Sequence, residues 1–174
     1  MPIFNEVYRG KRVLVTGNTG FKGSWLSFWL THLGADVHGF SNGVPTKPSM
    51  FEDIGIKRKI KHVNGDVRDS AGLMSEVERV RPEFVFHLAA QPIVRTSFVN
   101  PYETFDTNAR GTLNLLEALR VVNPDCIAIF ITSDKCYRNV EWTWGYREND
   151  ALGGDDPYSA SKAAAEILIH SYAS

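Results

Sequence analysis

Short apolar runs alternate along the chain with longer segments in which apolar residues recur every three to four positions. The first run, RVLVT at residues 12–16, is apolar without alternation, as expected of a strand that is covered on both faces. Four later runs have the same character and are expected to form strands: ADVHGF at 35–40, IKHVNGDV at 60–67, FVFHLAA at 84–90 and CIAIFITS at 126–133.

The segments between these runs have helical spacing. The first expected helix ends at Gly34 and carries one apolar stripe, formed by Trp25, Leu26, Trp29, Leu30 and Leu33. Further helices are expected at 71–82, closed by a proline, at 100–122 and at 158–172. Strand and helix alternate from start to finish, which predicts an α/β fold of Rossmann type, with a doubly wound parallel sheet between helices.

No strand follows the last helix, so the crossover that this helix should complete is missing. We therefore expect residues 1–174 to be one dinucleotide-binding domain of Rossmann type. It would be the N-terminal portion of a longer protein, truncated before the last strands and a smaller substrate domain.

Composition narrows the class of protein. Of 174 residues, 43% are hydrophobic and 22% are charged, which is typical of a globular domain. The net charge of -1 provides no basic field for nucleic acid or an anionic membrane. The N-terminus lacks the apolar core of a signal peptide, and no run approaches the roughly 18 apolar residues of a membrane span. A cytoplasmic setting fits best.

The two cysteines, Cys126 and Cys136, argue for a reducing compartment and against a disulfide-stapled secreted fold. No metal site is expected, because no pair of histidines or cysteines has the spacing of zinc ligands.

Three glycines stand at every third position between the first strand and the first helix, in GNTGFKG at 17–23. In such a turn Gly17 permits a tight bend, Gly20 lets the backbone approach a pyrophosphate, and Gly23 lets the helix pack closely on the sheet. The alternative is a glycine-rich turn that serves only close packing. The G-x-x-G-x-x-G spacing is typical of the short-chain dehydrogenase/reductase superfamily.

The end of the second strand lacks the carboxylate that would hold the adenosine ribose. Ser41 and Asn42 are the nearest polar residues, and no arginine adjoins them to accept a 2'-phosphate. NAD is therefore expected rather than NADP. Asp66, at the end of the third strand, could accept a hydrogen bond from the adenine amino group, or it could be a solvated turn residue.

Tyr158 and Lys162, in YSASK, lie four residues apart and so on one face of a helix. An ammonium beside a phenol favours the phenolate, which makes Tyr158 a candidate general base near neutral pH. Exposed helices often carry such a pair by chance. Its combination with the glycine turn is what indicates an active site.

Ser133, Asp134 and Lys135 follow the fifth strand, and catalytic residues gather at the carboxyl ends of such strands. Ser133 can donate to a substrate oxygen, Asp134 can act as an acid and Lys135 as a base. The alternative is a charged turn in which Asp134 and Lys135 only pair with each other.

Three further features have a structural alternative beside the functional one. Ala89 and Ala90, at the end of the fourth strand, are small enough to admit a nicotinamide, or they mark a densely packed strand end. Asn108 lies within a helix, where its amide needs a partner, so it is expected to bridge two elements. Trp142 and Trp144 are expected to pack within a loop rather than to stack on bases.

Taken in order, VTGNTGFKG, HLAAQPIVRTS, TNARGTLNLLEAL, TSDKCY, EWTWGYRE and DPYSASKAAAE resemble the extended short-chain dehydrogenases that act on nucleotide sugars. The resemblance is strongest to the 4,6-dehydratases of the CDP-glucose branch. In the dTDP-glucose branch the motif after the fifth strand reads Thr-Asp-Glu. A lysine at position 135 is the departure expected of the CDP-specific branch.

The resemblance implies a lyase that converts CDP-D-glucose to CDP-4-keto-6-deoxy-D-glucose, a precursor of dideoxysugars in bacterial surface polysaccharide. NAD is the implied cofactor, with transient oxidation at C4, elimination of water across C5 and C6, and hydride return to C6. It also implies a homodimer or homotetramer, paired through helices at 106–121 and 159–172.

The implied catalytic residues are Ser133, Asp134, Lys135, Tyr158 and Lys162. The implied cofactor-binding residues are Gly17, Asn18, Thr19, Gly20, Phe21, Lys22, Gly23, Ser41, Asp66, Val67, Leu88, Ala89, Ala90, Gln91, Thr107, Tyr158 and Lys162.

Two other functions remain open. A nucleotide-sugar 4-epimerase of the same superfamily shares the glycine turn and the Tyr158–Lys162 pair but does not need an acid and a base beside Ser133. A non-catalytic NAD(P) sensor shares the glycine turn but would not be expected to keep Tyr158 and Lys162 together.

Overall fold

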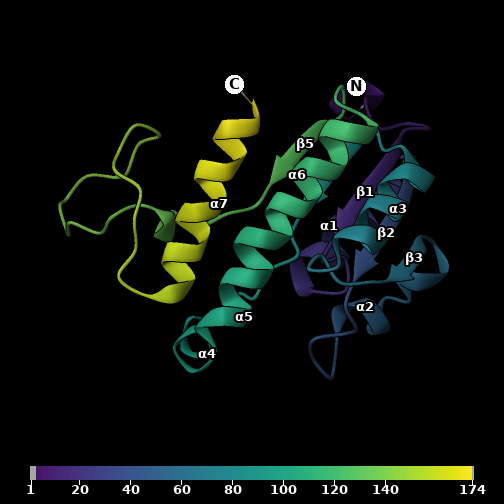
Figure 1. The fold of residues 1–174 in the computed structure, drawn as a ribbon. Coiled ribbons are helices and arrows are strands. Elements are labelled where there is room, and N and C mark those ends of the chain that lie inside the picture. The colour runs from purple at the N-terminus through teal and green to yellow at the C-terminus, as the bar shows by residue number, and fades with distance from the viewer. Residues whose placement is uncertain (1–2, 174) are drawn as a thin grey trace.

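The computed structural model describes residues 3–173 and contains one parallel sheet of five strands (Figure 1). The strands are β1 (Arg12–Thr16), β2 (Asp36–Ser41), β3 (Lys61–Asn64), β4 (Phe84–His87) and β5 (Ile127–Phe130). Their order across the sheet is β3-β2-β1-β4-β5. The order reverses between β1 and β4, which confirms the doubly wound fold of Rossmann type.

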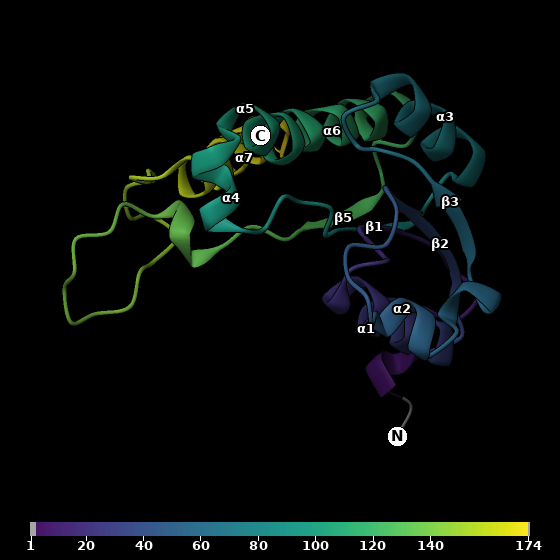
Figure 2. The ribbon, with the colours of Figure 1, turned by 90° about the horizontal axis from the view of Figure 1, so that it is seen from below.

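Helices cover both faces of the sheet, as the view from below shows (Figure 2). One face is covered by α1 (Phe21–His32) and the short α2 (Met50–Asp53). The other face is covered by α3 (Ser70–Val80), α6 (Gly111–Val122) and α7 (Pro157–Ala173). Within residues 3–173, no helix is both long and apolar enough to cross a membrane.

The long helix expected at 100–122 forms, with one irregularity. It begins as α5 (Pro101–Phe105), passes through a π-helical turn at Asp106–Arg110 and continues as α6. Asn100 caps its start by accepting a hydrogen bond from the Glu103 N–H. The remaining short elements are α4 (Val94–Val99) and the 3-10 turns η1 (Ile3–Glu6), η2 (Ile56–Arg58) and η4 (Asp134–Cys136).

The sheet divides the core into two apolar clusters. Leu14 points to the α3 and α6 side, where it packs with Leu73 and Leu115, while Val13 and Val15 point to the α1 side. All three β1 side chains are 0% exposed. This confirms that the continuous apolar run marks a strand covered on both faces, and each such burial contributes about 1.5–3 kcal/mol to stability.

The face of α1 that packs on the sheet is formed by small residues together with Leu30, and the two tryptophans of the expected apolar stripe lie outside it. Its buried residues are Gly23, Ser24, Ser27 and Leu30, whereas Trp25 and Trp29 are 50% and 48% exposed. Leu30 and Leu26 of the stripe do pack against the core. The tryptophans do not, because Gly23 lies against the backbone of Gly17, and a helix held that close leaves no room for an indole beneath it.

The connection from β5 to α7 is long and folds back on itself. Tyr137 bridges to Leu152, and the Gly153 N–H donates to the carbonyl of Cys136. The loop between these contacts projects away from the sheet (Figures 1 and 2). In that loop the ring of Trp142 lies 5.7 Å from the ring of Tyr146, while Trp144 is 70% exposed.

Candidate active site

The carboxyl ends of four strands meet at one edge of the sheet. Thr16, the last residue of β1, pairs in register with Phe40 of β2 and with His87 of β4, and His87 pairs with Phe130 of β5. The glycine turn at 17–23 and the segment at 88–91 therefore begin side by side, and the group at 133–135 follows the end of the neighbouring strand β5. In open α/β sheets, ligands bind at this edge, where the strand order reverses.

Two of the three glycines in the turn tolerate no side chain. Gly17 has a φ of +71°, and a Cβ there would lie 2.6 Å from the backbone nitrogen of Ala89. A Cβ on Gly23 would lie 2.1 Å from the carbonyl oxygen of Gly17. Both contacts are with backbone, which cannot move aside. The alternative of a purely packing role therefore fits these two positions well.

Gly20 differs from its two neighbours. The nearest atom to a Cβ at Gly20 would be the Gly17 oxygen at 3.4 Å, an ordinary contact distance, so the fold itself does not require a glycine there. Gly20 is the N-cap of α1 and makes no side-chain cap, which leaves helix N–H groups for an outside acceptor. A glycine at an uncapped helix start, without an internal reason for it, fits a pyrophosphate.

The side chain of Asn18 points away from this opening. It is 0% exposed, packs over Gly39 of β2, and its amide nitrogen lies 3.2 Å from Nδ1 of His62 on β3. Its Oδ1 has no partner within the described residues. The Thr19 N–H, in turn, points to the Ser41 hydroxyl at 3.4 Å. Asn18 and Ser41 thus tie the turn to β2 and β3, while Phe21 and Lys22 are exposed at the start of α1.

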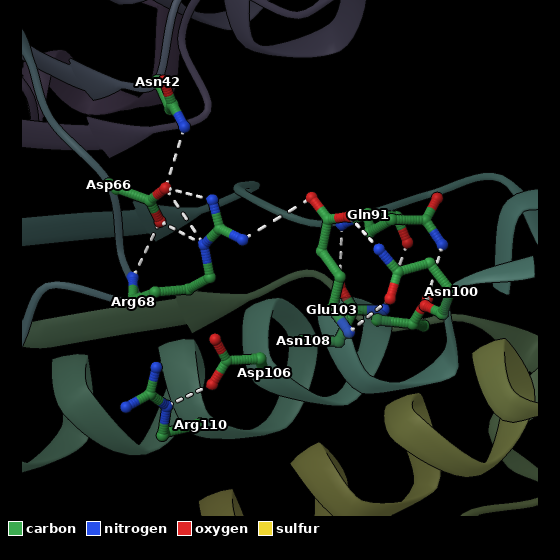
Figure 3. A network of polar contacts seen from close by, with 10 residues as sticks. Asn42, Asp66, Arg68, Gln91, Asn100, Glu103, Asp106, Asn108 and Arg110 are labelled. Carbon is green, nitrogen blue, oxygen red and sulfur yellow. Dashed lines mark hydrogen bonds and ion pairs between the residues drawn. The ribbon is translucent and has the colours of Figure 1, made fainter.

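A polar network lies at the adenosine end of the expected site (Figure 3). Asn42 donates to the Asp66 carboxylate at 2.8 Å, and Arg68 binds the same carboxylate at 2.6 Å. The Arg68 contact is the main reason that the pKa of Asp66 lies below its usual value. Arg68 also reaches Glu103 at 3.5 Å. Asp66 is therefore a partnered residue and not a freely solvated one.

Arg68 was missed from the sequence because it is distant from Ser41 and Asn42 along the chain. The expectation that no arginine adjoins Ser41 and Asn42 stays a prediction, since Arg68 is linked to Asn42 through the Asp66 carboxylate. Its guanidinium is already shared between two carboxylates, so its charge is largely neutralised. The carboxylate that Asn42 contacts therefore comes from Asp66, just past β3.

Asn108 bridges two elements, as expected of an asparagine within a helix (Figure 3). It accepts the Gln91 N–H at 2.8 Å and donates to the Gln91 carbonyl at 3.1 Å. It also donates to the Ser161 hydroxyl of α7 at 2.9 Å. Asn108 lies in the π-helical turn beside Thr107, and only 1% of it is exposed. It fixes the segment at 88–91 relative to α7.

His87 is the second buried tie, and its partners define its tautomer. Thr16 lies 2.7 Å from Nδ1 and Thr112 lies 3.3 Å from Nε2. The Thr112 hydroxyl donates to the Asn108 carbonyl, so Nε2 must donate to Thr112 and Nδ1 must accept from Thr16. This arrangement satisfies a neutral ring. Burial lowers the pKa of His87 to about 3, with a smaller contribution from the Lys162 charge.

The Tyr158–Lys162 pair lies at the start of α7, and both side chains face inward. Tyr158 is 9% exposed and Lys162 is 6% exposed. The Lys162 ammonium donates to the carbonyl of Ile131, just past β5, at 3.1 Å. Burial lowers the pKa of Lys162 to about 8, and Glu166 opposes that shift. The pair is therefore not an exposed chance pairing.

Ser133, Asp134 and Lys135, here called the donor–acid–base group, form the turn into η4. The Ser133 hydroxyl donates to Asp134 at 3.1 Å and accepts the Lys135 N–H at 3.2 Å. Asp134 and Lys135 are exposed, and the ion pairs found within residues 3–173 include none between them. The alternative of a closed Asp134–Lys135 pair does not describe this turn.

The parallel sheet and its strand order define an α/β protein of the extended short-chain dehydrogenase type. The family described as GDP-mannose 4,6 dehydratase matches residues 14–174, and the chain belongs to it. This confirms the resemblance to nucleotide-sugar dehydratases.

Individual relatives extend the comparison. A CDP-glucose 4,6-dehydratase of Salmonella typhimurium is 50% identical over 170 residues, which are 98% of this chain and 47% of that protein. A GDP-mannose 4,6-dehydratase of Vibrio cholerae is 32% identical over 93% of this chain and 45% of its own length. The crystal structure of UDP-glucose 4-epimerase from Brucella ovis in complex with NAD has a TM-score of 0.81 at 28% identity, over 94% of this chain and 48% of that one. The chain thus spans about half the length of the relatives it matches.

Proposed function

We propose that the protein is an NAD-dependent nucleotide-sugar 4,6-dehydratase that converts CDP-D-glucose to CDP-4-keto-6-deoxy-D-glucose. The observation that carries the proposal is the donor–acid–base group beside the buried Tyr158–Lys162 pair at one sheet edge. The choice of CDP-glucose is supported by the relative of that name with 50% identity. The choice of a dehydratase over a plain dehydrogenase is supported by the open acid and base at positions 134 and 135.

NAD is the proposed cofactor, because Gly20 and the uncapped start of α1 offer N–H donors to a pyrophosphate. The residues proposed to hold it are Gly17, Thr19, Gly20, Phe21, Lys22 and Gly23 at the phosphates, Ser41, Asp66 and Val67 toward the adenosine, and Leu88, Ala89, Ala90, Gln91, Thr107, Tyr158 and Lys162 along the nicotinamide half. Asn18 would support the turn from behind. When bound, NAD supplies a temporary store for the hydride that leaves C4 and returns to C6.

Tyr158 would act on the sugar 4-hydroxyl. Its phenolate takes the hydroxyl proton, and the buried Lys162 ammonium stabilises that phenolate. Ser133 would donate a hydrogen bond to the same sugar oxygen. Oxidation at C4 comes first because the resulting ketone makes the hydrogen on C5 acidic.

Lys135 and Asp134 would then eliminate water. Lys135, or a water that it holds, takes the C5 proton, while Asp134 gives a proton to the departing 6-hydroxyl. The exposure of both side chains lets them reach a sugar held over the strand ends. The elimination removes one proton at C5 and adds one at the leaving oxygen, which departs as water. The proton taken at C5 would then return to C5 as the hydride reaches C6, which completes the 4-keto-6-deoxy product.

The test compares Asp134→Asn and Lys135→Ala in the intact protein with CDP-glucose and NAD. Formation of the 4-keto sugar, followed by its alkaline absorbance, should fall by about 100-fold or more in each variant. NAD affinity should stay unchanged, and Asp155→Asn, an exposed neighbour on the same loop, should keep full turnover. Unchanged turnover in both variants would contradict the dehydratase assignment.

A nucleotide-sugar 4-epimerase is the second candidate, favoured by the likeness of this fold to solved UDP-glucose 4-epimerases. It would convert CDP-glucose to its C4 epimer without accumulating a 4-keto product. It would also tolerate both substitutions, since it needs no acid and base beside Ser133.

We also propose a cytoplasmic homodimer or homotetramer. The two free thiols of Cys126 and Cys136 fit a reducing compartment. Helices α6 and α7 run side by side, linked by the Tyr172 hydroxyl, which donates to Glu117 at 3.0 Å, and they expose Val121 and Ile167 by 56% and 58%. Such a helix pair can pack against a second copy. A monomer in gel filtration of the intact protein would contradict this pairing.

A further inference from the structure

Two polar contacts connect the end of β5 to α7. The first is the hydrogen bond from the Lys162 ammonium to the Ile131 carbonyl at 3.1 Å. The second involves the next residue along the chain, Thr132, whose hydroxyl donates to the carboxylate of Glu166. Lys162 and Glu166 are four residues apart, one turn along the same face of α7. Two successive residues after the strand are thus held by two successive turns of the helix.

These contacts lie between the two halves of the proposed catalytic machinery. Thr132 immediately precedes the donor–acid–base group, and Lys162 shares its helix face with Tyr158. Any shift of the strand end along α7 would change the separation of the Ser133 and Tyr158 hydroxyls. The Thr132–Glu166 contact resists that shift, because Glu166 lies one turn beyond Lys162 on α7, on the side away from Tyr158.

Glu166 lies one helical turn beyond Lys162, and its negative charge raises the pKa of Lys162. Within residues 3–173, the other titratable groups that interact electrostatically with Lys162 or Glu166 include His87 on β4, and Cys136 and Tyr137 at and just after η4. Tyr158 lies one turn before Lys162 on α7. His87 is neutral, and the pKa of Cys136 is raised by burial and then by Glu166, so neither supplies a negative charge near neutral pH. Burial removes water from the Lys162 ammonium and lowers its pKa, whereas attraction to the Glu166 carboxylate favours the ammonium and raises the pKa.

We propose that Glu166 is a positioning residue, held in place by Thr132, that keeps the Lys162 side chain charged and fixes α7 against the strand end. The meaning of this for turnover rests on the proposed function, because there the Lys162 ammonium supports the Tyr158 phenolate. The contact and the charge state themselves do not depend on the identity of the substrate.

The test measures the titration of Lys162 directly, in the intact protein without nucleotide or sugar. Competitive labelling with an amine-reactive reagent across pH, followed by peptide mass spectrometry, gives the titration midpoint of this lysine. In Glu166→Gln, which keeps an oxygen for Thr132 but loses the charge, the midpoint should fall by about half a pH unit or more. Glu117→Gln, an exposed carboxylate on α6, should leave it unchanged.

Thr132 is tested by a second pair of variants that leave the Glu166 charge in place. Thr132→Val should lower the Lys162 midpoint by less than Glu166→Gln does, because the carboxylate is no longer held, and Thr132→Ser should restore it. A Lys162 midpoint in Glu166→Gln equal to that of the unchanged protein would overturn the proposal. If the Lys162 midpoint is unchanged in Thr132→Val, Thr132 does not position Glu166, and that part of the proposal is wrong.

Turnover provides the separate readout. Activity that needs the ammonium is lost as pH rises through the Lys162 pKa, so the alkaline limb of kcat/KM should move to lower pH in Glu166→Gln, with KM for CDP-glucose within about twofold. If the unchanged protein does not act on CDP-glucose, the proposed function fails while the lysine titration still decides the role of Glu166.

Discussion

The two ends of the strand-end site are built by opposite means. At the glycine turn, backbone lies against backbone, and a Cβ on Gly23 would come within 2.1 Å of the Gly17 oxygen. At the β5–α7 end, polar side chains make the contacts: Lys162 donates to the Ile131 carbonyl, and Ser133 donates to the Asp134 carboxylate. The glycine turn depends on the absence of side chains, and the β5–α7 end depends on the polar groups of its side chains.

Because of this difference, substitutions at the two ends should affect different properties, namely stability at the glycine turn and turnover at the β5–α7 end. A close-packed backbone has no way to absorb an added atom, so a change there should cost folding and cofactor binding together. Hydrogen bonds at a partly exposed turn can be removed one at a time for about 1 kcal/mol each. Changes at the β5–α7 end should therefore alter turnover while the fold persists.

The largest effect is expected from Gly23→Ala. The added methyl group meets backbone of the turn on two sides, at Gly17 and at Asn18, so the protein should lose several kcal/mol of stability and its NAD affinity. Thermal unfolding and fluorescence titration with NAD would measure both losses. Gly145→Ala is the matched control, because nothing lies within 4 Å of a Cβ there. Equal stability and equal NAD affinity in Gly23→Ala and Gly145→Ala would contradict the claim that the glycine turn has no room for a side chain.

Tyr158→Phe should give the reverse pattern. Removing only the hydroxyl takes away the proposed base, so turnover of CDP-glucose should fall by about 10²–10⁴-fold. The ring keeps its packing at the buried start of α7, so the unfolding temperature and NAD affinity should stay close to those of the unchanged protein. A large loss of stability without a loss of turnover per folded molecule would contradict the assignment of Tyr158.

His87 joins the two ends and predicts an acid-sensitive fold. Its pKa is about 3 in the folded chain and 6.5 as an ordinary histidine, so between these values the unfolded chain binds the extra proton. Stability should therefore be fully present above about pH 6.5 and be lost progressively as pH falls toward 3. Urea unfolding from pH 7.5 to 4 would measure the slope.

In His87→Gln the baseline stability should be lower, and the part of the slope due to this ring should disappear. His32→Gln, at an exposed position, should keep the original slope. An unchanged slope in His87→Gln would show that other groups cause the acid sensitivity.

The smallest effect is expected from Asn42→Ala. It removes one exposed hydrogen bond to Asp66, while Arg68 continues to hold that carboxylate, so stability should change by about 0.5 kcal/mol or less. NAD affinity, measured by calorimetry, should change only a few-fold. A loss of binding as large as that of Gly23→Ala would mean that this amide contacts the dinucleotide directly.

The sequence predicted the fold correctly wherever the local residue pattern agrees with the packing of the element in the tertiary structure. The unbroken apolar run at 12–16 predicted a doubly covered strand, and the π-helical turn still placed Asn108 as the expected bridge. It was only partly right at α1, where Leu30 of the apolar stripe faces the core but close packing at Gly23 requires small residues in place of the tryptophans. Hydrophobicity alone does not reveal how near two backbones come.

The sequence also did not predict hydrogen bonds and ion pairs between residues that lie far apart along the chain. Asn42, Asp66 and Arg68 come from two strand ends, and Thr132 meets Glu166 only because α7 returns to β5. A single charged or hydroxyl residue carries no sign of its partner along the chain. The candidate roles of Tyr158 and Lys162 could be predicted because one helical turn places both on the same face.

Turnover of CDP-glucose labelled with deuterium at C4 tests the central claim most directly. In a dehydratase the label leaves C4, is stored within the same site and returns to C6, so NMR of the product from the intact protein should show deuterium at C6 of a 4-keto-6-deoxy sugar. Deuterium retained at C4 of an epimerised sugar would contradict the account.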